Sequence, residues 1–315
     1  MVRISVIIPA LNDEKTIKKC LETLKGQTFG DFEVIVADGH SKDRTVEVAR
    51  QYGATVVYEN TGTVGGARGA AVKAANGRII ASTDADAYFP KGWLAKIAAE
   101  FDGDPDLVAL GGEDVVDDGK GYFETAVFQI DLARIGNRAD PKKRIRGCNA
   151  AYRKDAVLGV GGFNEALVAL EEADLNSRLA EKGYKMKFNP DITVYHRRRS
   201  SFGGLFRQMF RNGVGSISAI RANPKMLNPK HLLPFLAVPA LLAWASLLNA
   251  ASVYIVTAAG AYAILMIAQA TLILAKTGKW QYLPILPAIL AVREIAFGLG
   301  LHYGVLIRGK PAKKM

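Results

Sequence analysis

The sequence predicts an α/β domain followed by an α-helical membrane region, and three observations carry this prediction. Short runs rich in Val and Ile alternate with helical patterns through about the first 110 residues, which is typical of a parallel sheet flanked by helices. From Leu232 to Ala275, 44 residues include no Asp, Glu, Lys, Arg or His, enough for two bilayer crossings of about 20 residues each. The first 191 residues hold 26 Lys and Arg against 29 Asp and Glu, whereas the rest hold 15 against one.

The elements of the first domain follow from these patterns in chain order. The expected strands are Ile4 to Ile8, Phe32 to Ala37, Thr55 to Tyr58, Ile79 to Thr83, Leu107 to Leu110 and Ile192 to His196. The expected helices are Glu14 to Lys25, Arg44 to Tyr52, Gly66 to Asn76 and Gly92 to Phe101. Regularity fades between Gly111 and Arg146, and we expect this irregular stretch to cover a substrate.

Compartment and charge point to a protein with its first domain in the cytosol. The two cysteines, Cys20 and Cys148, provide neither a disulfide framework nor a metal-ligand spacing, which favours a reducing compartment. The first apolar run is too short for a signal peptide. The basic excess lies in the membrane-proximal half and therefore indicates anionic lipid headgroups, not nucleic acid. Positive-inside flanking of membrane helices explains the same excess and is compatible with that interpretation.

The second half is predicted to anchor the chain. The division we expect is a first domain at 1–200, an amphipathic region at 201–231, membrane helices at 232–307 and a basic tail at 308–315. The amphipathic helix lies on the bilayer or, alternatively, packs on the first domain. A hairpin turning near Asn249 should keep both of its ends on the cytosolic side. Because Arg293 and Glu294 interrupt the last apolar stretch, Tyr282 to Ile307, we favour a re-entrant or in-plane segment there over a third crossing.

Polar residues follow the first two strands, where open parallel sheets bind ligands. The segment Pro9-Ala10-Leu11-Asn12-Asp13-Glu14 follows the first strand, and Asp38-Gly39-His40-Ser41-Lys42-Asp43 follows the second. No GxGxxG motif is present, so a nicotinamide-dinucleotide fold loses its main support. Asp38 suits an acceptor for a base N–H or a ribose hydroxyl.

Two further motifs suit a diphosphate and its counter-ion. The loop from Gly62 to Gly69 combines four glycines with Arg68 at a predicted helix start, which favours an anion, although a flexible surface loop has a similar composition. Asp84 and Asp86 follow the fourth strand two positions apart, so both carboxylates face one side of an extended chain. Such a pair, completed by phosphate oxygens, suits Mg²⁺ or Mn²⁺.

Five segments in this order resemble the family 2 glycosyltransferases of the GT-A fold, a Rossmann-like fold for nucleotide-diphospho-sugars. They are SVIIPALNDEKTIKKCLETL, VIVADGHSKDRTVEVA, GGARGAAVKAANGRIIASTDAD, RGCNAAYRKDAVLGVGGFNE and EEADLNSRLAEKGYK. The resemblance covers Arg3 to His196 and implies inversion at the anomeric carbon. It implies nucleotide binding by Pro9, Leu11, Glu14, Asp38 and Arg68, with metal and diphosphate binding by Asp84 and Asp86. His196 is then a further metal ligand, or alternatively a phosphate contact or a solvated residue.

The same resemblance implies a catalytic base at the start of a later helix. The family usually has Glu-Asp there, whereas this chain has Glu171-Glu172 with Asp174 two residues on. We favour Glu172 as the base and place Glu171 second. Acids in a first helical turn also stabilise the helix dipole, which accounts for one of the three but hardly for all.

We therefore expect a metal-dependent, membrane-bound inverting hexosyltransferase. It would transfer a sugar from UDP-sugar or GDP-sugar to polyprenyl or dolichyl phosphate, a lipid-linked saccharide or another glycoconjugate at the cytosolic face of the cell membrane. The alternative is a catalytically silent nucleotide-sugar-binding scaffold anchored to the membrane. A processive synthase is disfavoured because the Gln-x-x-Arg-Trp signature is absent. The sequence leaves the sugar, the base and the oligomeric state open.

Overall fold

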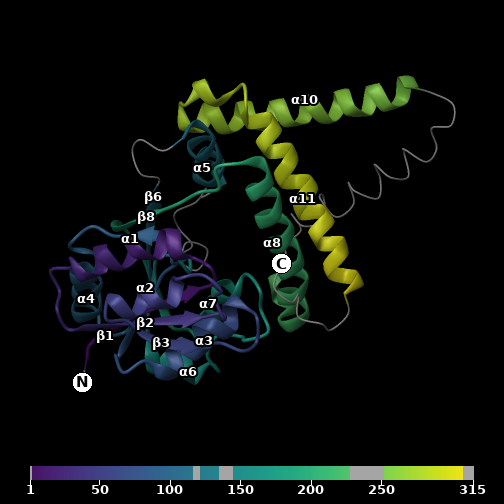
Figure 1. The fold of residues 1–315 in the computed structure, drawn as a ribbon. Helices are drawn as coiled ribbons and strands as arrows, with labels where there is room; N and C mark the ends of the chain where they lie inside the picture. Colours follow the sequence, from purple (N-terminus) through teal and green to yellow (C-terminus); the bar gives the residue numbers. More distant parts are fainter. Residues whose placement is uncertain (1, 116–120, 135–144, 228–251, 308–315) are drawn as a thin grey trace. The chain divides into compact units, whose positions relative to one another are not determined.

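The structure is a computed structural model that describes residues 2–115, 121–134, 145–227 and 252–307. These residues divide into two compact units (Figure 1). The first unit holds the described residues up to 115 together with 145–197, and the second holds 121–134, 198–227 and 252–307. Each unit is described below by itself.

The first unit is built on a mixed sheet. Its described strands have the order β3-β2-β1-β4-β7-β6-β8-β5. The strands are β1 (Ile4–Ala10), β2 (Phe32–Asp38), β3 (Thr55–Tyr58), β4 (Ile79–Ser82), β5 (Ala87–Tyr88), β6 (Leu107–Val115), β7 (Ala150–Arg153) and β8 (Lys185–His196). β1 runs parallel to β2 and β4, β2 to β3, and β6 to β8, whereas β7 is antiparallel to both β4 and β6. The predicted parallel strands at the N-terminus are thus confirmed.

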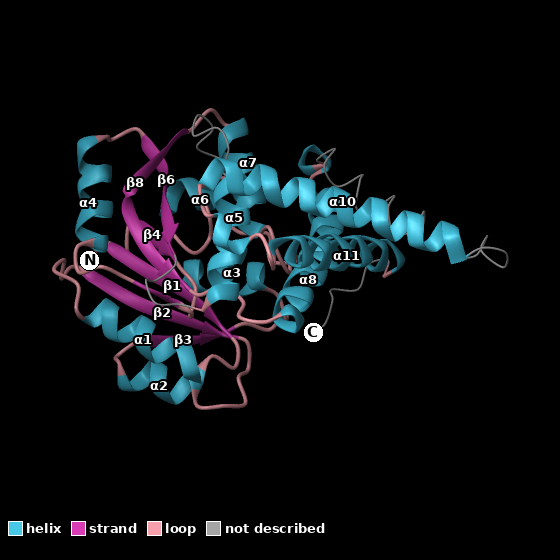
Figure 2. Ribbon diagram, turned by 90° about the horizontal axis from the view of Figure 1, so that it is seen from above, coloured by secondary structure: helices cyan, strands magenta, loops and turns pink. Residues whose placement is uncertain are grey.

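Helices cover both faces of this sheet (Figure 2). One face carries α1 (Glu14–Lys25), α2 (Thr45–Gln51) and α4 (Trp93–Gly103), and the other carries α3 (Val64–Ala74), α6 (Lys154–Gly159) and α7 (Glu171–Glu181). Val6 and Ile8 pack into the first core and Ile7 into the second. Because side chains alternate along a strand, a strand buried on both faces is apolar at nearly every position.

The stretch from Gly111 to Arg146, expected to be irregular, is more regular than its sequence indicates. β6 continues to Val115, and residues Tyr122–Arg134 form helix α5. This helix falls within the predicted first domain but belongs to the helical second unit. Its Ala126, Val127 and Ile130 are buried in the core of that unit. The sequence does not indicate this helix, because α5 is apolar around most of its circumference and so shows no distinct apolar stripe at the helical period.

The second unit adds α8 (Phe202–Ala222), α10 (Ser252–Thr277) and α11 (Leu286–Leu306), with single 3₁₀ turns at Pro224–Met226 and Trp280–Tyr282. α8 and α11 pack closely through glycines. A Cβ added to Gly213 would overlap the Phe297 carbonyl, and one added to Gly300 would overlap the Phe210 carbonyl. Small residues of this kind let the backbones of two helices approach, as in membrane helix pairs. The interfacial position of α8 stays a prediction.

Two helices of the described residues are long and apolar enough to cross a bilayer, in the windows Gly260–Thr277 and Leu286–Leu306. α11 is one continuous helix of 21 residues, about 31 Å long at 1.5 Å per residue. The re-entrant or in-plane placement expected for Tyr282 to Ile307 stays a prediction. The expected first crossing from Leu232, its turn near Asn249 and the basic tail at 308–315 lie outside the described residues.

Candidate active site

Asp84, Asp86 and His196 lie together at one end of the sheet. Asp84 and Asp86 follow β4, and β5 then pairs antiparallel with β8, so that Ala87 stands opposite His196. The Nε2 atom of His196 is 3.0 Å from Asp86 Oδ1 and 3.5 Å from Asp84 Oδ2. One ligand atom from each of the three lies within 4.8 Å of the others. This is the set the sequence singled out for a metal, and its carboxylate-rich chemistry fits a hard divalent ion.

The backbone around these carboxylates is fixed by its neighbours. Thr83 donates its backbone N–H to the Ile7 carbonyl at 3.1 Å and its hydroxyl to the Cys148 carbonyl at 3.0 Å. Both aspartates nevertheless stay reachable, because the Asp84 side chain is 31% exposed and that of Asp86 is 18% exposed. A rigid backbone with accessible oxygens is the arrangement that positions an ion without burying it.

Arg68 joins this group to the start of α7. Its side chain is buried, with Nη2 2.8 Å from Asp84 Oδ1 and Nε 3.1 Å from Ser82 Oγ. The same guanidinium forms an ion pair with the buried Glu171. Because one planar guanidinium binds both carboxylates, it fixes their relative position. The predicted diphosphate contact of Arg68 stays a prediction.

Gly147 provides the space for Arg68. A Cβ on Gly147 would lie 2.5 to 2.8 Å from the guanidinium atoms, closer than side chains pack. The segment RGCN, noted in the sequence, therefore contributes a glycine with a definite steric purpose. Gly147 and Ser82 were not among the predicted site residues, since nothing in the sequence indicates that they contact Arg68.

The glycine loop before α3 is closed by protein contacts. Gly65 donates its N–H to the Leu167 carbonyl at 3.0 Å, and a Cβ there would overlap the Asn164 carbonyl. Thr63 caps the helix by accepting the Gly66 N–H at 2.9 Å. The glycines therefore admit the segment from Asn164 to Leu167 against the helix start. The N–H groups of Gly65 and Gly66 are taken by protein acceptors, so the open anion cradle is wrong for these two residues. The alternative, a flexible surface loop, is wrong there as well, because the loop packs against the segment from Asn164 to Leu167.

The three acids at the start of α7 have different surroundings. Glu171 pairs with Arg68, and the buried Asp174 accepts bonds from Arg178 at 2.7 and 3.0 Å. Glu172 is half-buried, and no described side chain makes a hydrogen bond or ion pair with its carboxylate. Burial chiefly, and then the negative charge of Glu172, raise the pKa of Tyr152, so Glu172 lies near that ring. Among the described residues, Glu172 is therefore the acid of the three whose carboxylate has no bonded side chain, and its role as the base stays a prediction.

The predicted nucleotide residues lie at the ends of β1 and β2. Asp38 is buried and accepts the Ser41 N–H at 2.9 Å as well as the Ser41 hydroxyl. Glu14 accepts the Arg44 N–H at 3.1 Å, and Leu11 is 40% exposed. Pro9 pairs with Ala37 across the two parallel strands. Asp38 thus orders its own loop, and its predicted contact with a nucleoside stays a prediction.

Comparisons with known proteins agree on one family. The profile described as "Glycosyl transferase family 2" matches residues 5–159. Glycosyltransferase AglE of Haloferax volcanii is 30% identical over 228 residues, covering 68% of this chain and 73% of that protein. Succinoglycan biosynthesis protein ExoA of Rhizobium meliloti is 24% identical, covering 74% and 75%.

Solved structures match over nearly the whole chain. Mannosyltransferase PcManGT from Pyrobaculum calidifontis, in complex with GDP-Man and Mn²⁺, has a TM-score of 0.64 at 21% identity and covers 97% of this chain and 88% of its own. S. aureus TarS in complex with UDP has a TM-score of 0.51 at 20% identity, covering 97% and 92%. At these identities the likeness shows the fold alone.

Proposed function

This chain belongs to glycosyltransferase family 2 and has the GT-A fold, and from that premise we propose that it transfers a sugar from a UDP-sugar or GDP-sugar to a membrane-presented acceptor with inversion. The observation that carries the proposal is the convergence of Asp84, Asp86 and His196 beside the Arg68–Glu171 pair. GDP-Man with Mn²⁺ and UDP in the two structural neighbours support a nucleotide-sugar donor and a divalent ion. Either Mg²⁺ or Mn²⁺ fits the ligand set.

The proposed chemistry divides between the donor and the acceptor. Asp84, Asp86 and His196 would hold the divalent ion, which would supply positive charge to stabilise the departing nucleoside diphosphate. Arg68 fixes Asp84 relative to Glu171 and thereby aligns the sheet end with α7. Glu172 takes the proton from an acceptor hydroxyl as the new glycosidic bond forms. A phosphate acceptor carries no such proton, and Glu172 then only positions it.

The membrane part of the proposal rests on apolar surface and charge. Within the candidate span of α10, Ile264 is 69% exposed, Ile267 50% and Leu272 65%, and a helix with so much exposed apolar surface needs a lipid or protein partner. The single acid and 15 bases after residue 191 favour attachment at the cytosolic side. We therefore propose polyprenyl phosphate, dolichyl phosphate or a lipid-linked saccharide as the acceptor class. The domain boundaries predicted from the sequence stay a separate part of the proposal.

Transfer to lipid is the direct test. The purified chain in detergent is incubated with membrane lipid extract, Mn²⁺ and a panel of radiolabelled UDP-sugars and GDP-sugars, and label entering the organic phase is counted. We expect one donor to label lipid, and Asp86→Ala to abolish the transfer. Asp106→Asn, which changes an exposed carboxylate in the same unit, should leave transfer unchanged.

Two results would contradict different parts of the proposal. Donor hydrolysis with no label in lipid, from any extract, would mean that the acceptor is not a membrane lipid. Full transfer by Asp86→Ala would instead contradict the proposed metal site. A folded protein that neither transfers nor hydrolyses any donor in the panel would support the silent scaffold over the enzyme.

A further inference from the structure

A second group of metal-ligating side chains lies beside the first and shares His196 with it. Asp114 comes from β6, Cys148 from the loop before β7, and His196 ends β8. β6 pairs with both β7 and β8, with Gly111 opposite Ala150 and Asp114 opposite Val194. This register brings the three residues to one place, although they are far apart in the sequence.

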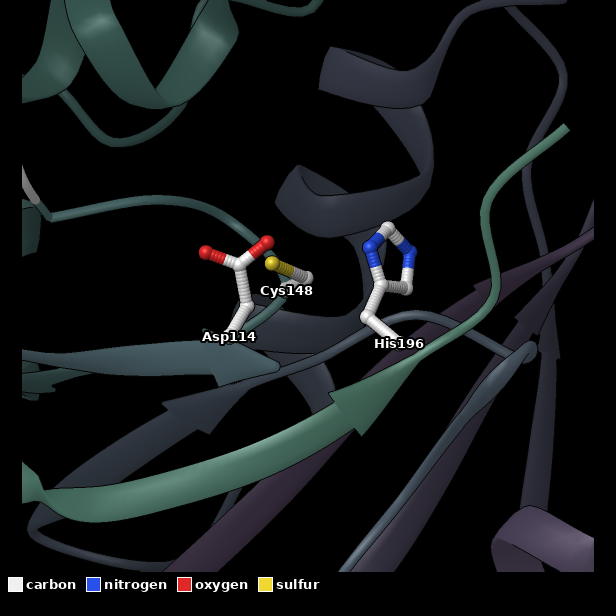
Figure 3. Close-up of side chains that lie close together, drawn as sticks. All are labelled: Asp114, Cys148 and His196. Carbon is white, nitrogen blue, oxygen red and sulfur yellow. The ribbon is translucent and has the colours of Figure 1, made fainter. Parts of the chain in front are cut away.

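The three ligand atoms face one another (Figure 3). One oxygen of Asp114, the sulfur of Cys148 and one ring nitrogen of His196 all lie within 4.8 Å of each other. Ligand atoms bound tetrahedrally to one zinc ion are about 3.5 Å apart at bond lengths of 2.0 to 2.3 Å. Small side-chain rotations therefore suffice to close the group around an ion.

The surroundings hold this group in place. Asp114 and Cys148 are 2% and 4% exposed. Asn149, next to Cys148, donates from Nδ2 to the Glu113 and Ile192 carbonyls at 2.9 and 2.8 Å, which ties the three strands together. Asp114 Oδ1 also pairs with Arg146 Nη1 at 2.9 Å, and a carboxylate has further acceptor positions for a metal.

The ligand types of this second group favour a different class of ion from the one expected at the donor site. A cysteine sulfur with an imidazole and a carboxylate suits Zn²⁺ or Co²⁺, whereas Mg²⁺ and Mn²⁺ prefer oxygen ligands. We infer that Asp114, Cys148 and His196 form a zinc site, with water as the fourth ligand. Binding converts the Cys148 thiol to a zinc-bound thiolate and releases one proton to solvent.

Because His196 belongs to both groups, occupancy of the two sites is coupled. Its Nε2 faces Asp84 and Asp86, and Figure 3 shows one ring nitrogen turned towards Cys148 and Asp114 and the other away from them. A neutral imidazole has one lone pair for a metal and one N–H. Zinc on the Cys148 side leaves an N–H facing Asp86, so His196 is lost to the donor ion. This coupling rests on the proposed donor-metal site, whereas the zinc site itself does not.

Cobalt reports on the zinc site without any sugar donor. The purified full chain, stripped of metal, is titrated with Co²⁺, and the thiolate-to-cobalt charge-transfer absorption is followed. We expect the band in the wild type and its loss in Cys148→Ser. The apparent affinity should fall at least about 100-fold, because losing an outer-shell partner alone costs about 10- to 100-fold. Thermal unfolding of the variant checks that it is folded.

Matched variants separate this site from other thiols and from the donor site. Cys20→Ala should keep the band, because Cys20 is buried, donates its thiol to the Asp84 carbonyl at 3.8 Å, and is not part of the group of Asp114, Cys148 and His196. Asp86→Asn should also keep it, even though that variant is expected to lose sugar transfer. Asp114→Asn should weaken Co²⁺ binding and keep the thiolate band. A wild type without the band, or a band that survives in folded Cys148→Ser, would overturn the zinc site.

The coupling has its own measurement. Binding of Mn²⁺ is followed by electron paramagnetic resonance with and without one equivalent of Zn²⁺. We expect zinc to weaken Mn²⁺ binding in the wild type and to have no effect in Cys148→Ser. If the cobalt band is present but zinc leaves Mn²⁺ binding unchanged, the coupling through His196 is wrong and the zinc site stands.

Discussion

Among the described residues, each unit contains a buried cluster of arginine and carboxylate side chains, and these two clusters differ in composition and purpose. In the sheet unit, Arg68 joins Asp84 and Glu171 next to accessible carboxylates. In the helical unit, Asp131 of α5 pairs with Arg293 of α11 at 3.3 Å and with Arg198 at 3.6 Å. The first cluster lies where acids gather at the end of a sheet and can bind a cation. The second joins three segments among apolar helices, which explains how Arg293 lies in the middle of an apolar helix.

The largest effect should come from the acid beside the first cluster. Glu172→Gln should slow transfer by about 10²- to 10⁴-fold if the acceptor is a hydroxyl, the usual value of a lost general base. A phosphate acceptor should reduce the effect to well under 100-fold, since there is no proton to remove. Single-turnover rates at saturating donor measure this change. Equal loss in Ser177→Ala, a neighbouring position on α7, would mean that the helix start is merely disturbed.

Removing the carboxylate of the second cluster should affect stability alone. Asp131→Asn leaves arginine charge without its carboxylate in a buried setting, which typically costs about 3 to 5 kcal/mol. Thermal unfolding in detergent measures the loss, and Mn²⁺ affinity should not change. Asp102→Asn is the control, because its carboxylate is 64% exposed and pairs with Arg3 at the surface, where a pair contributes at most about 1 kcal/mol. A shift in Mn²⁺ affinity for Asp131→Asn would show that the two clusters are not independent.

A smaller effect is expected where Gly147 touches the first cluster. Gly147→Ala should displace Arg68 and with it Asp84, reducing transfer by roughly 10- to 100-fold, a range typical of misplaced catalytic groups. Gly159→Ala is the matched control, since no atom lies within 4 Å of a Cβ added there. Steady-state kinetics of the two variants are compared. Unchanged activity in Gly147→Ala would indicate that Arg68 does not need its observed position.

The smallest effect is a pH dependence at Asp43, which lies between β2 and α2 in the sheet unit. Burial raises the pKa of Asp43, but hydrogen bonds from Thr45 and Glu14 outweigh it and hold the pKa below its usual 3.8. Stability from this carboxylate is therefore present above pH 3.8 and is lost as the pH falls through the lower folded value. Unfolding of Asp43→Asn should differ from the wild type more at pH 6 than at pH 3. An equal difference at both values would contradict this assignment.

Strand-end residues show how far local pattern reaches. Asp84, Asp86 and Asp38 were assigned to strand ends correctly, because buried strands have continuous apolar runs and the polar residue that ends each run is visible. Pairing was not visible, since it depends on contacts between distant segments. His196 stands next to Asp86 only because β5 pairs with β8. Arg68 illustrates the same limit, as its position depends on Ser82 and Gly147.

Cys148 shows a limit of spacing rules. Its distance in sequence from Cys20 matches no metal motif, so local spacing does not indicate it as a ligand, yet register through β6 brings it to Asp114 and His196. A rule based on local spacing finds ligands that share one loop or helix. It cannot find ligands supplied by three strands.

The sequence by itself determined the α/β class, the apolar helical region and the residue types available at each strand end, because these depend on local composition and periodicity. Only the tertiary structure decided that Arg68 binds Asp84 and Glu171, that no described side chain bonds to the Glu172 carboxylate, and that α5 packs with the helical unit. Those outcomes depend on strand order, on close approach at glycine and on burial of charge. Such quantities exist only once distant parts of the chain are in contact.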